Sequence, residues 1–140
     1  MLAGPVPVRV LRAAQFHEFV GELAGWGRRD DHVEVFRART QLVAARSVAE
    51  ALVDLAVAEW DADRAGETIA EIAGPREENL AAMARLLLAR RGESLRVDEV
   101  VDESDPDAAL YDSEVMLAGP GATLAGPTFA AWLHAARAAA

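Results

Sequence analysis

The chain of 140 residues is predicted to fold as an α/β domain, and three observations lead to this prediction. Short β-branched runs alternate with longer runs of helical spacing, and glycine or proline separates most of them. Hydrophobic residues make up 52% of the chain and charged residues 26%, a composition too apolar for a disordered segment. A chain of 14.9 kDa should bury about two-thirds of its surface on folding, which suffices for one domain with a sizeable core.

The first predicted unit is a strand followed at once by a helix. Residues 8–11 are short, β-branched and preceded by two prolines, which indicates the start of a largely buried strand. From Ala14 onward the apolar spacing becomes helical, and the two glycines that flank Trp26 are expected to end the helix. The residues that carry this spacing, at i, i+3, i+4 and i+7, are Phe16, Phe19, Val20 and Leu23.

The rest of the chain alternates in the same way. Asn79 is a suitable N-cap for one helix, and Gly92 stands where a glycine commonly follows a helix. Thr128 can cap the last helix, whereas the glycine- and proline-rich residues 119–127 are expected to be irregular. The predicted strands are residues 33–36, 68–73 and 95–101; the predicted helices are residues 45–60, 80–91, 108–116 and a last helix from 129, with a turn at 61–66.

Composition excludes several classes of function. A net charge of −9 argues against nucleic acid and anionic membranes as partners. The chain has no cysteine, which excludes disulfides, thiolate metal sites and cysteine nucleophiles, and no lysine, which excludes Schiff-base and P-loop lysine chemistry. It has neither a signal peptide nor the roughly 18 consecutive apolar residues of a transmembrane helix, so a cytoplasmic location is expected.

No catalytic or metal-binding motif stands out. Neither glycine pair, at 25–27 or at 119–121, is followed by the third glycine of a dinucleotide fingerprint, and no serine is flanked by glycines as in a hydrolase elbow. The acidic run 102–107 lacks the glycine and the final glutamate of a calcium loop. His17 lies off the apolar stripe and is predicted to be a surface residue, the alternative being a role in a pocket. Nothing selects one carboxylate pair for glycoside hydrolysis from the 23 acidic residues.

Residues 8–19 resemble the strand-to-helix turn that opens the carboxyl-terminal half of NmrA-like proteins, which are atypical short-chain dehydrogenases/reductases. Residues 43–52, 71–75 and 126–133 are similar to later pieces of that half, although Ser47 stands where the family usually has an acid. The resemblance implies the carboxyl-terminal part of a Rossmann-like doubly wound sheet plus a small substrate-side subdomain, without the glycine-rich nucleotide-binding half. Residues 1–75 would hold the last sheet strands and residues 76–140 the substrate-side segment of this single partial domain.

The resemblance also implies a site. Family members bind NAD or NADP, and by position Ala14, Gln15 and Phe16 would border the nicotinamide ring. Phe19 and Trp26 could line a substrate pocket, the alternative being that the aromatic side chains simply pack in the core. Gln15 is the strongest candidate, because it places an amide at the carboxyl end of a strand, where open α/β sheets bind ligands.

Two classes of function follow. The first is the substrate-side half of an NAD(P)-dependent reductase or NAD(P)-sensing NmrA-like protein. The family's glycine-rich loop and Tyr-x-x-x-Lys pair lie upstream of the matched segment, so the isolated chain should be inactive and bind cofactor weakly or not at all. A misplaced start codon, a split gene or decay would account for the loss of the upstream half. The alternative is a non-enzymatic remnant that acts as a dimerisation or partner-binding module. The expected partners are a small-molecule substrate and either a second copy or the missing amino-terminal half.

Overall fold

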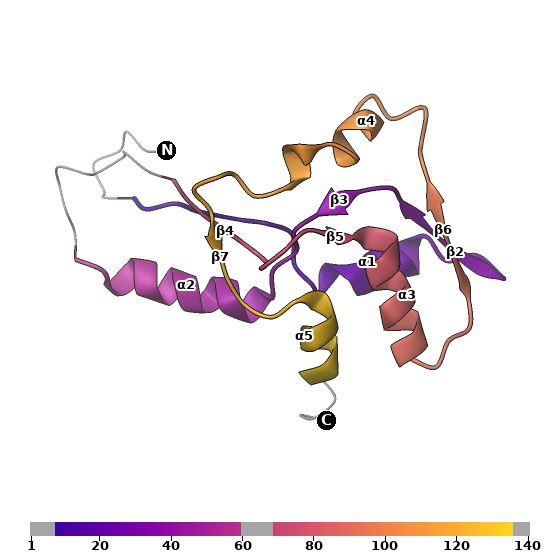
Figure 1. Ribbon diagram of the computed structural model, residues 1–140, viewed down its shortest axis with the longest axis horizontal. Helices are drawn as coiled ribbons and strands as arrows, with labels where there is room; N and C mark the ends of the chain where they lie inside the picture. Colours follow the sequence, from indigo (N-terminus) through magenta and orange to yellow (C-terminus); the bar gives the residue numbers. More distant parts are fainter. Residues whose placement is uncertain (1–7, 60–68, 136–140) are drawn as a thin grey trace.

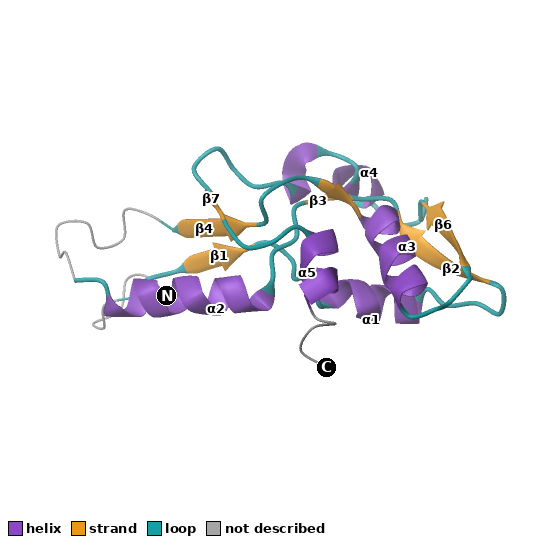
Figure 2. Cartoon of the chain, turned by 60° about the horizontal axis from the view of Figure 1, so that its bottom comes forward, coloured by secondary structure: helices purple, strands orange, loops and turns teal. Residues whose placement is uncertain are grey.

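A three-stranded parallel sheet forms one end of the molecule in the computed structural model, which describes residues 8–59 and 69–135 (Figure 1). Its strand order is β1 (Leu11–Ala13), β4 (Ala70–Ala73) and β7 (Thr123–Leu124). Helix α2 (Ala45–Val57) lies along this sheet in both views (Figure 2). The contact between them is a small apolar cluster around Val43, Val48 and Ile72.

The larger core lies at the other end, where helices pack against a second parallel pair of strands. Strands β2 (His32–Phe36) and β6 (Arg96–Val100) pair along five residues, and Val33 and Val35 of β2 are buried. Helices α1 (Phe19–Trp26), α3 (Leu80–Arg90) and α5 (Phe129–Ala135) supply most of the remaining core side chains. The sequence predicted two portions of one partial domain, residues 1–75 and 76–140. The pairing of β2 with β6 connects these two portions.

Short elements connect the two ends. Strands β3 (Arg39–Thr40) and β5 (Glu78–Asn79) form an antiparallel pair. Helix α4 (Ala108–Tyr111) and the 3₁₀ helix η2 (Glu114–Met116) then lead the chain back to β7 (Figure 1). The described chain is therefore a mixed α/β fold with small parallel and antiparallel sheets, as the alternating pattern predicted at the coarse level.

Several local predictions are confirmed. The side chain of Asn79 accepts a hydrogen bond from the Ala82 N–H at 2.8 Å and so caps α3, and Gly92 follows this helix with a φ of 74°. Thr128 Oγ1 accepts from the Ala131 N–H at 3.3 Å at the start of α5. The strands predicted at residues 33–36, 68–73 and 95–101 correspond to β2, β4 and β6.

Other predictions are wrong at their boundaries. The first helix begins at Phe19 and not near Ala14, because the preceding residues bond to β4 at Ile72 and to Val43, in the segment before α2, and then form a turn at residues 17–18. Residues 119–127 contain β7, which pairs with β4 and leaves no local signal in the sequence. The helix predicted at 108–116 is divided into α4 and η2. The end of the helix predicted at 45–60 and the turn at 61–66 lie outside the described residues.

A matched pair of glycine substitutions tests the packing of the sheet. A Cβ on Gly74, after β4, would stand 1.9 Å from the Leu42 carbonyl oxygen, whereas a Cβ on Gly25 in α1 meets nothing within 4 Å. We expect Gly74→Ala to lower the free energy of unfolding by about 1–3 kcal/mol through overpacking. Gly25→Ala should leave it unchanged or raise it by up to about 1 kcal/mol, because alanine favours the helix. Urea denaturation measures both; equal effects of the two variants would contradict the packing at Gly74.

Candidate functional site

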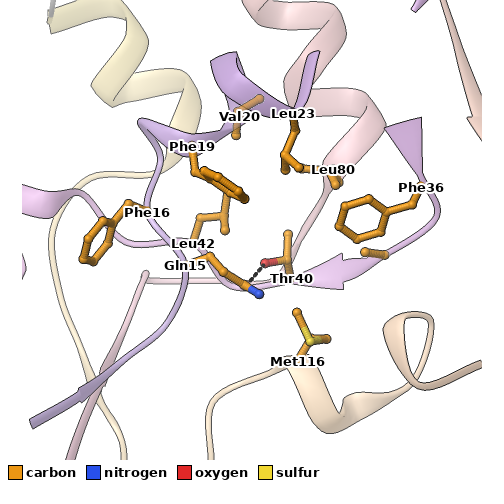
Figure 3. Close-up of a pocket in the computed structure, with 11 residues that line it drawn as sticks. Gln15, Phe16, Phe19, Val20, Leu23, Phe36, Thr40, Leu42, Leu80 and Met116 are labelled. Atoms are coloured by element: carbon orange, nitrogen blue, oxygen red, sulfur yellow. Dashed lines mark hydrogen bonds between the residues drawn. The ribbon is translucent and has the colours of Figure 1, made fainter. Parts of the chain in front are cut away.

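Gln15 stands at the carboxyl end of β1, where the chain leaves the sheet. Its carbonyl accepts a hydrogen bond from the Val43 N–H at 3.0 Å, which fixes the backbone. Its side chain is exposed, and Oε1 accepts a hydrogen bond from Thr40 Oγ1 at 3.3 Å (Figure 3). Gln15 and Met116 each line three separate cavities. The Gln15 amide therefore lies where three cavities meet, and residues far apart in the sequence form their walls.

The first cavity is a narrow apolar slot of about 30 Å³ between α1 and the chain around β3 (Figure 3). Such a volume accommodates no more than one or two water molecules. A ring-sized group could therefore lie against the slot but could not enter it. The apolar side chains of its wall are Phe16, Phe19, Val20, Leu23, Phe36, Leu42, Leu80 and Met116.

The second cavity, of about 450 Å³, lies between β1 and residues 115–118. Its polar wall is an ion pair in which Arg12 Nη2 stands 2.8 Å from Glu71 Oε2. The hydrogen bond from Arg12 lowers the pKa of the Glu71 carboxyl below its usual value, and a hydrogen bond from the Gly119 backbone adds to this effect. Ala14 and Gln15 border the same cavity.

The third cavity, of about 550 Å³, lies between the end of β6 and α4. Tyr111 and Phe36 form part of its wall, with ring centroids 5.3 Å apart. The Tyr111 hydroxyl donates a hydrogen bond to Asp105 Oδ2 at 3.1 Å, and this carboxylate raises the pKa of the tyrosine above its usual value. Tyr111 is therefore a protonated hydrogen-bond donor at neutral pH.

His17 was predicted to be a surface residue, and this prediction is wrong. The side chain is 1% exposed and lies against the rings of Phe129 and Trp132, at centroid distances of 5.4 and 5.5 Å. Nε2 is 3.0 Å from the Pro127 carbonyl oxygen, so it carries the proton and donates it there. The prediction failed because His17 lies in a turn before α1 begins at Phe19, so the helical spacing used to place it does not apply.

Carboxylates occupy the N-termini of two helices near this junction. The Ala45 N–H at the start of α2 donates to Glu18 Oε2 at 3.2 Å, and the Phe129 N–H at the start of α5 donates to Glu78 Oε2 at 3.2 Å. Phosphate groups commonly bind the free backbone N–H groups at a helix N-terminus. At α2 and α5 a glutamate carboxylate already accepts from such an N–H group, and its negative charge would repel a phosphate.

The structure brings most of the predicted site residues together. Ala14 and Gln15 border the 450 Å³ cavity, and Gln15, Phe16 and Phe19 border the apolar slot. Trp26 lines none of the three cavities: it is 67% exposed and packs edge-on against Phe19, with centroids 5.4 Å apart.

Sequence reasoning missed residues that reach the site from distant elements. Met116 comes from η2, Thr40 from β3 and Tyr111 from α4. Pairings between distant segments bring these elements to Gln15: the Val43 N–H, just after β3, donates to the Gln15 carbonyl, and β7 pairs with β4 beside β1. No short-range pattern in the sequence records those pairings, although a polar residue at the end of a predicted strand did identify Gln15.

Comparisons with known proteins returned nothing: no family model matches the chain, and neither the curated proteins nor the solved structures searched contain a match. Within residues 8–59 and 69–135, no helix has the length and apolar character needed to cross a membrane. The same residues contain no group of three or more histidine and carboxylate side chains that could hold a metal ion.

A pair of histidine substitutions tests the buried position of His17. His17→Phe keeps a ring against Phe129 but leaves the partly buried Pro127 carbonyl without its donor, which should cost about 1–3 kcal/mol of stability. His134→Phe, on the exposed part of α5, should change stability by less than about 0.5 kcal/mol. Thermal unfolding of both variants measures the difference, and a His17→Phe variant as stable as the parent chain would contradict the placement.

Proposed function

We propose that the chain is the substrate-side portion of an NAD(P)-dependent reductase or NAD(P)-sensing protein of the NmrA-like kind, assembled with or joined to a nucleotide-binding half. The observation that supports this proposal is the position of Gln15, at the carboxyl end of a parallel strand and on the border of three cavities. Open α/β sheets bind their ligands at that end of the strands. The cavities of about 450 and 550 Å³ are within the usual size range of small-molecule sites.

The residues around Gln15 suit the nicotinamide end of such a cofactor. The Gln15 amide can both donate to and accept from a carboxamide. The slot lined by Phe16 and Phe19 is too narrow for a nicotinamide ring, so the ring would lie in the 450 Å³ cavity beside Gln15, where residues 115–118 offer apolar side chains. When bound, the cofactor would supply hydride chemistry; the chain's part is to orient the ring and exclude water.

The described residues offer no comparable contacts for the pyrophosphate of such a cofactor. Phosphate affinity in nucleotide-binding sheets comes from free backbone N–H groups at a helix N-terminus after a glycine-rich loop. Here Glu18 and Glu78 already accept from the first N–H groups of α2 and α5. We therefore assign the contacts with the pyrophosphate to the nucleotide-binding half of the assembled protein.

We expect the isolated chain to bind NADH with a Kd no tighter than about 1 mM, which is about 4 kcal/mol of binding free energy. Reduced nicotinamide mononucleotide should shift the backbone NMR signals of Gln15 and Phe16 at millimolar concentration, whereas adenosine monophosphate should not. Gln15→Ala should abolish the shifts, and Arg90→Ala, at the exposed end of α3, should leave them unchanged. Micromolar binding of NADH, or equal shifts with both mononucleotides, would contradict the proposal.

We also expect no dehydrogenase turnover from the isolated chain. A tyrosine that acts as the acid in this chemistry needs a lowered pKa, and Asp105 raises the pKa of Tyr111, the single tyrosine of the chain. Assays with NADH and NADPH against carbonyl substrates should give rates equal to the background for the parent chain and for Tyr111→Phe. Reduction that depends on Tyr111 would show that this residue has a catalytic role.

A non-enzymatic partner-binding module is the second candidate, and the edge position of β1 favours it. Among the described strands β1 pairs only with β4, so one edge of this strand faces no other strand of the sheet. Open strand edges are common sites of association between chains. This candidate predicts a stable complex of the chain with itself or with a partner in the absence of any nucleotide.

A further inference from the structure

Helix α2 has a second apolar face beside the one that contacts the sheet. Val48 is its only buried residue, and Ala51 packs beside it on the sheet. Five further apolar residues follow one another at i, i+3, i+4, i+7 and i+8 and are all exposed. We call these residues the outer stripe: Ala49, Leu52, Val53, Ala56 and Val57.

Exposure along the outer stripe is large for aliphatic side chains. Leu52 is 47%, Val53 61% and Val57 75% exposed. Single exposed hydrophobic residues are normal on protein surfaces, but five at helical spacing form the stripe by which a helix packs against a partner. Figures 1 and 2 show α2 at the border of the molecule, with the sheet on one side and no described element on the other.

The charges at the two ends of the helix are complementary to each other. Arg46 lies in the first turn, where a positive charge is unfavourable to the helix dipole, and Glu59 follows the last turn, where a negative charge is unfavourable. Both side chains are exposed, and Arg46 also forms an ion pair with Glu50 of the same helix, with Nε 2.9 Å from Oε1. An antiparallel second copy of α2 would add Glu59 of the partner subunit beside Arg46, and it would give the Glu59 carboxylate an opposite charge.

We propose that the outer stripe is the contact between two copies of this chain, which pair their α2 helices in antiparallel orientation about a two-fold axis. The stripe is self-complementary in this arrangement. Leu52 lies opposite Val53 of the partner subunit at the axis, and the small side chain of Ala49 faces Ala56 of the partner subunit. Arg46 then faces Glu59 of the partner subunit.

The proposed contact is small. α2 has 13 residues and is therefore about 20 Å long, so one helix pair buries an area at the low end for specific interfaces, below about 1,200 Å² in total. The expected complex is a dimer that dissociates in the micromolar range. It is independent of the proposed reductase function, because no α2 residue lines the three cavities at Gln15.

Sedimentation velocity of the full chain over a range of micromolar concentrations tests the dimer. The parent chain should shift from monomer to dimer as concentration rises, and Val53→Glu should raise the dissociation constant at least about tenfold, since it places a charge at the centre of an apolar contact. Leu86→Glu is the matched control, because Leu86 is 47% exposed on α3, away from the stripe. Circular dichroism should show that both variants stay folded.

Cysteine pairing tests the orientation, because the parent chain contains no cysteine. A mixture of Ala49→Cys and Ala56→Cys should oxidise to a mixed disulfide dimer. Ala49→Cys alone should not crosslink, since two copies of residue 49 stand seven residues apart along the pair, about 10 Å, which is too far for a disulfide. Arg46→Glu and Glu59→Arg should each weaken the dimer, and the double variant should restore it.

Three outcomes would overturn the proposal. One is a parent chain that stays monomeric throughout the micromolar range. Another is association that Val53→Glu leaves unchanged while Val10→Lys, near β1, abolishes it, which would assign the contact to the sheet edge. The third is efficient crosslinking of Ala49→Cys with itself, which would indicate a parallel pair.

Discussion

Residues 14–17 give their backbone hydrogen bonds to two different neighbours, and the arrangement of the whole molecule depends on this exchange. The Ala14 N–H donates to the Ile72 carbonyl at 2.9 Å, which ends the pairing of β1 with β4. One residue later the chain turns to Val43, whose N–H donates to Gln15 and whose carbonyl accepts from His17. These four residues therefore connect three elements: they follow β1 of the sheet, bond to the segment just before α2, and lead into α1.

The exchange also decides which side chains of this segment are buried. His17 faces Phe129, which is fully buried, and ties α5 to the segment through the Pro127 carbonyl. Gln15 and Phe16 keep exposed side chains on the border of the apolar slot. Repacking at His17 would therefore reach Gln15 across only two peptide units of backbone, which couples the stability of α5 to the geometry of the candidate site.

The sequence predicted the features that depend on single residues or on short runs of residues. Asn79 and Gly92 delimit α3 because capping and positive φ depend on single residues, and the β-branched run around Val33 and Val35 forms a buried strand. Gln15 was selected as a candidate because the end of a strand is a local feature. Thr123 and Leu124 were not recognised as a strand, because the strand depends on pairing with β4, about fifty residues earlier. Met116 was not placed at the site, because only the fold brings η2 close to Gln15. The three short strands described do not identify the sheet as Rossmann-like, so that prediction depends on the resemblance alone.

The two surfaces proposed for binding differ in the physical reason for their specificity. At Gln15 the cavity beside β1 combines one amide with the apolar side chains of residues 115–118. The nearby N-termini of α2 and α5 already hold Glu18 and Glu78, so a ligand there gains more from its ring and its carboxamide than from phosphate charge. On α2 the outer stripe offers no polar group at all, and orientation is set by Arg46 and Glu59 at its ends. With a net charge of −9 on each copy, two chains repel one another over distances longer than the roughly 8 Å screening length at physiological salt. Association through the outer stripe therefore depends on contacts that act only at short range. These are the apolar contact and the charge pairs at its ends, which together offset the repulsion between the two chains.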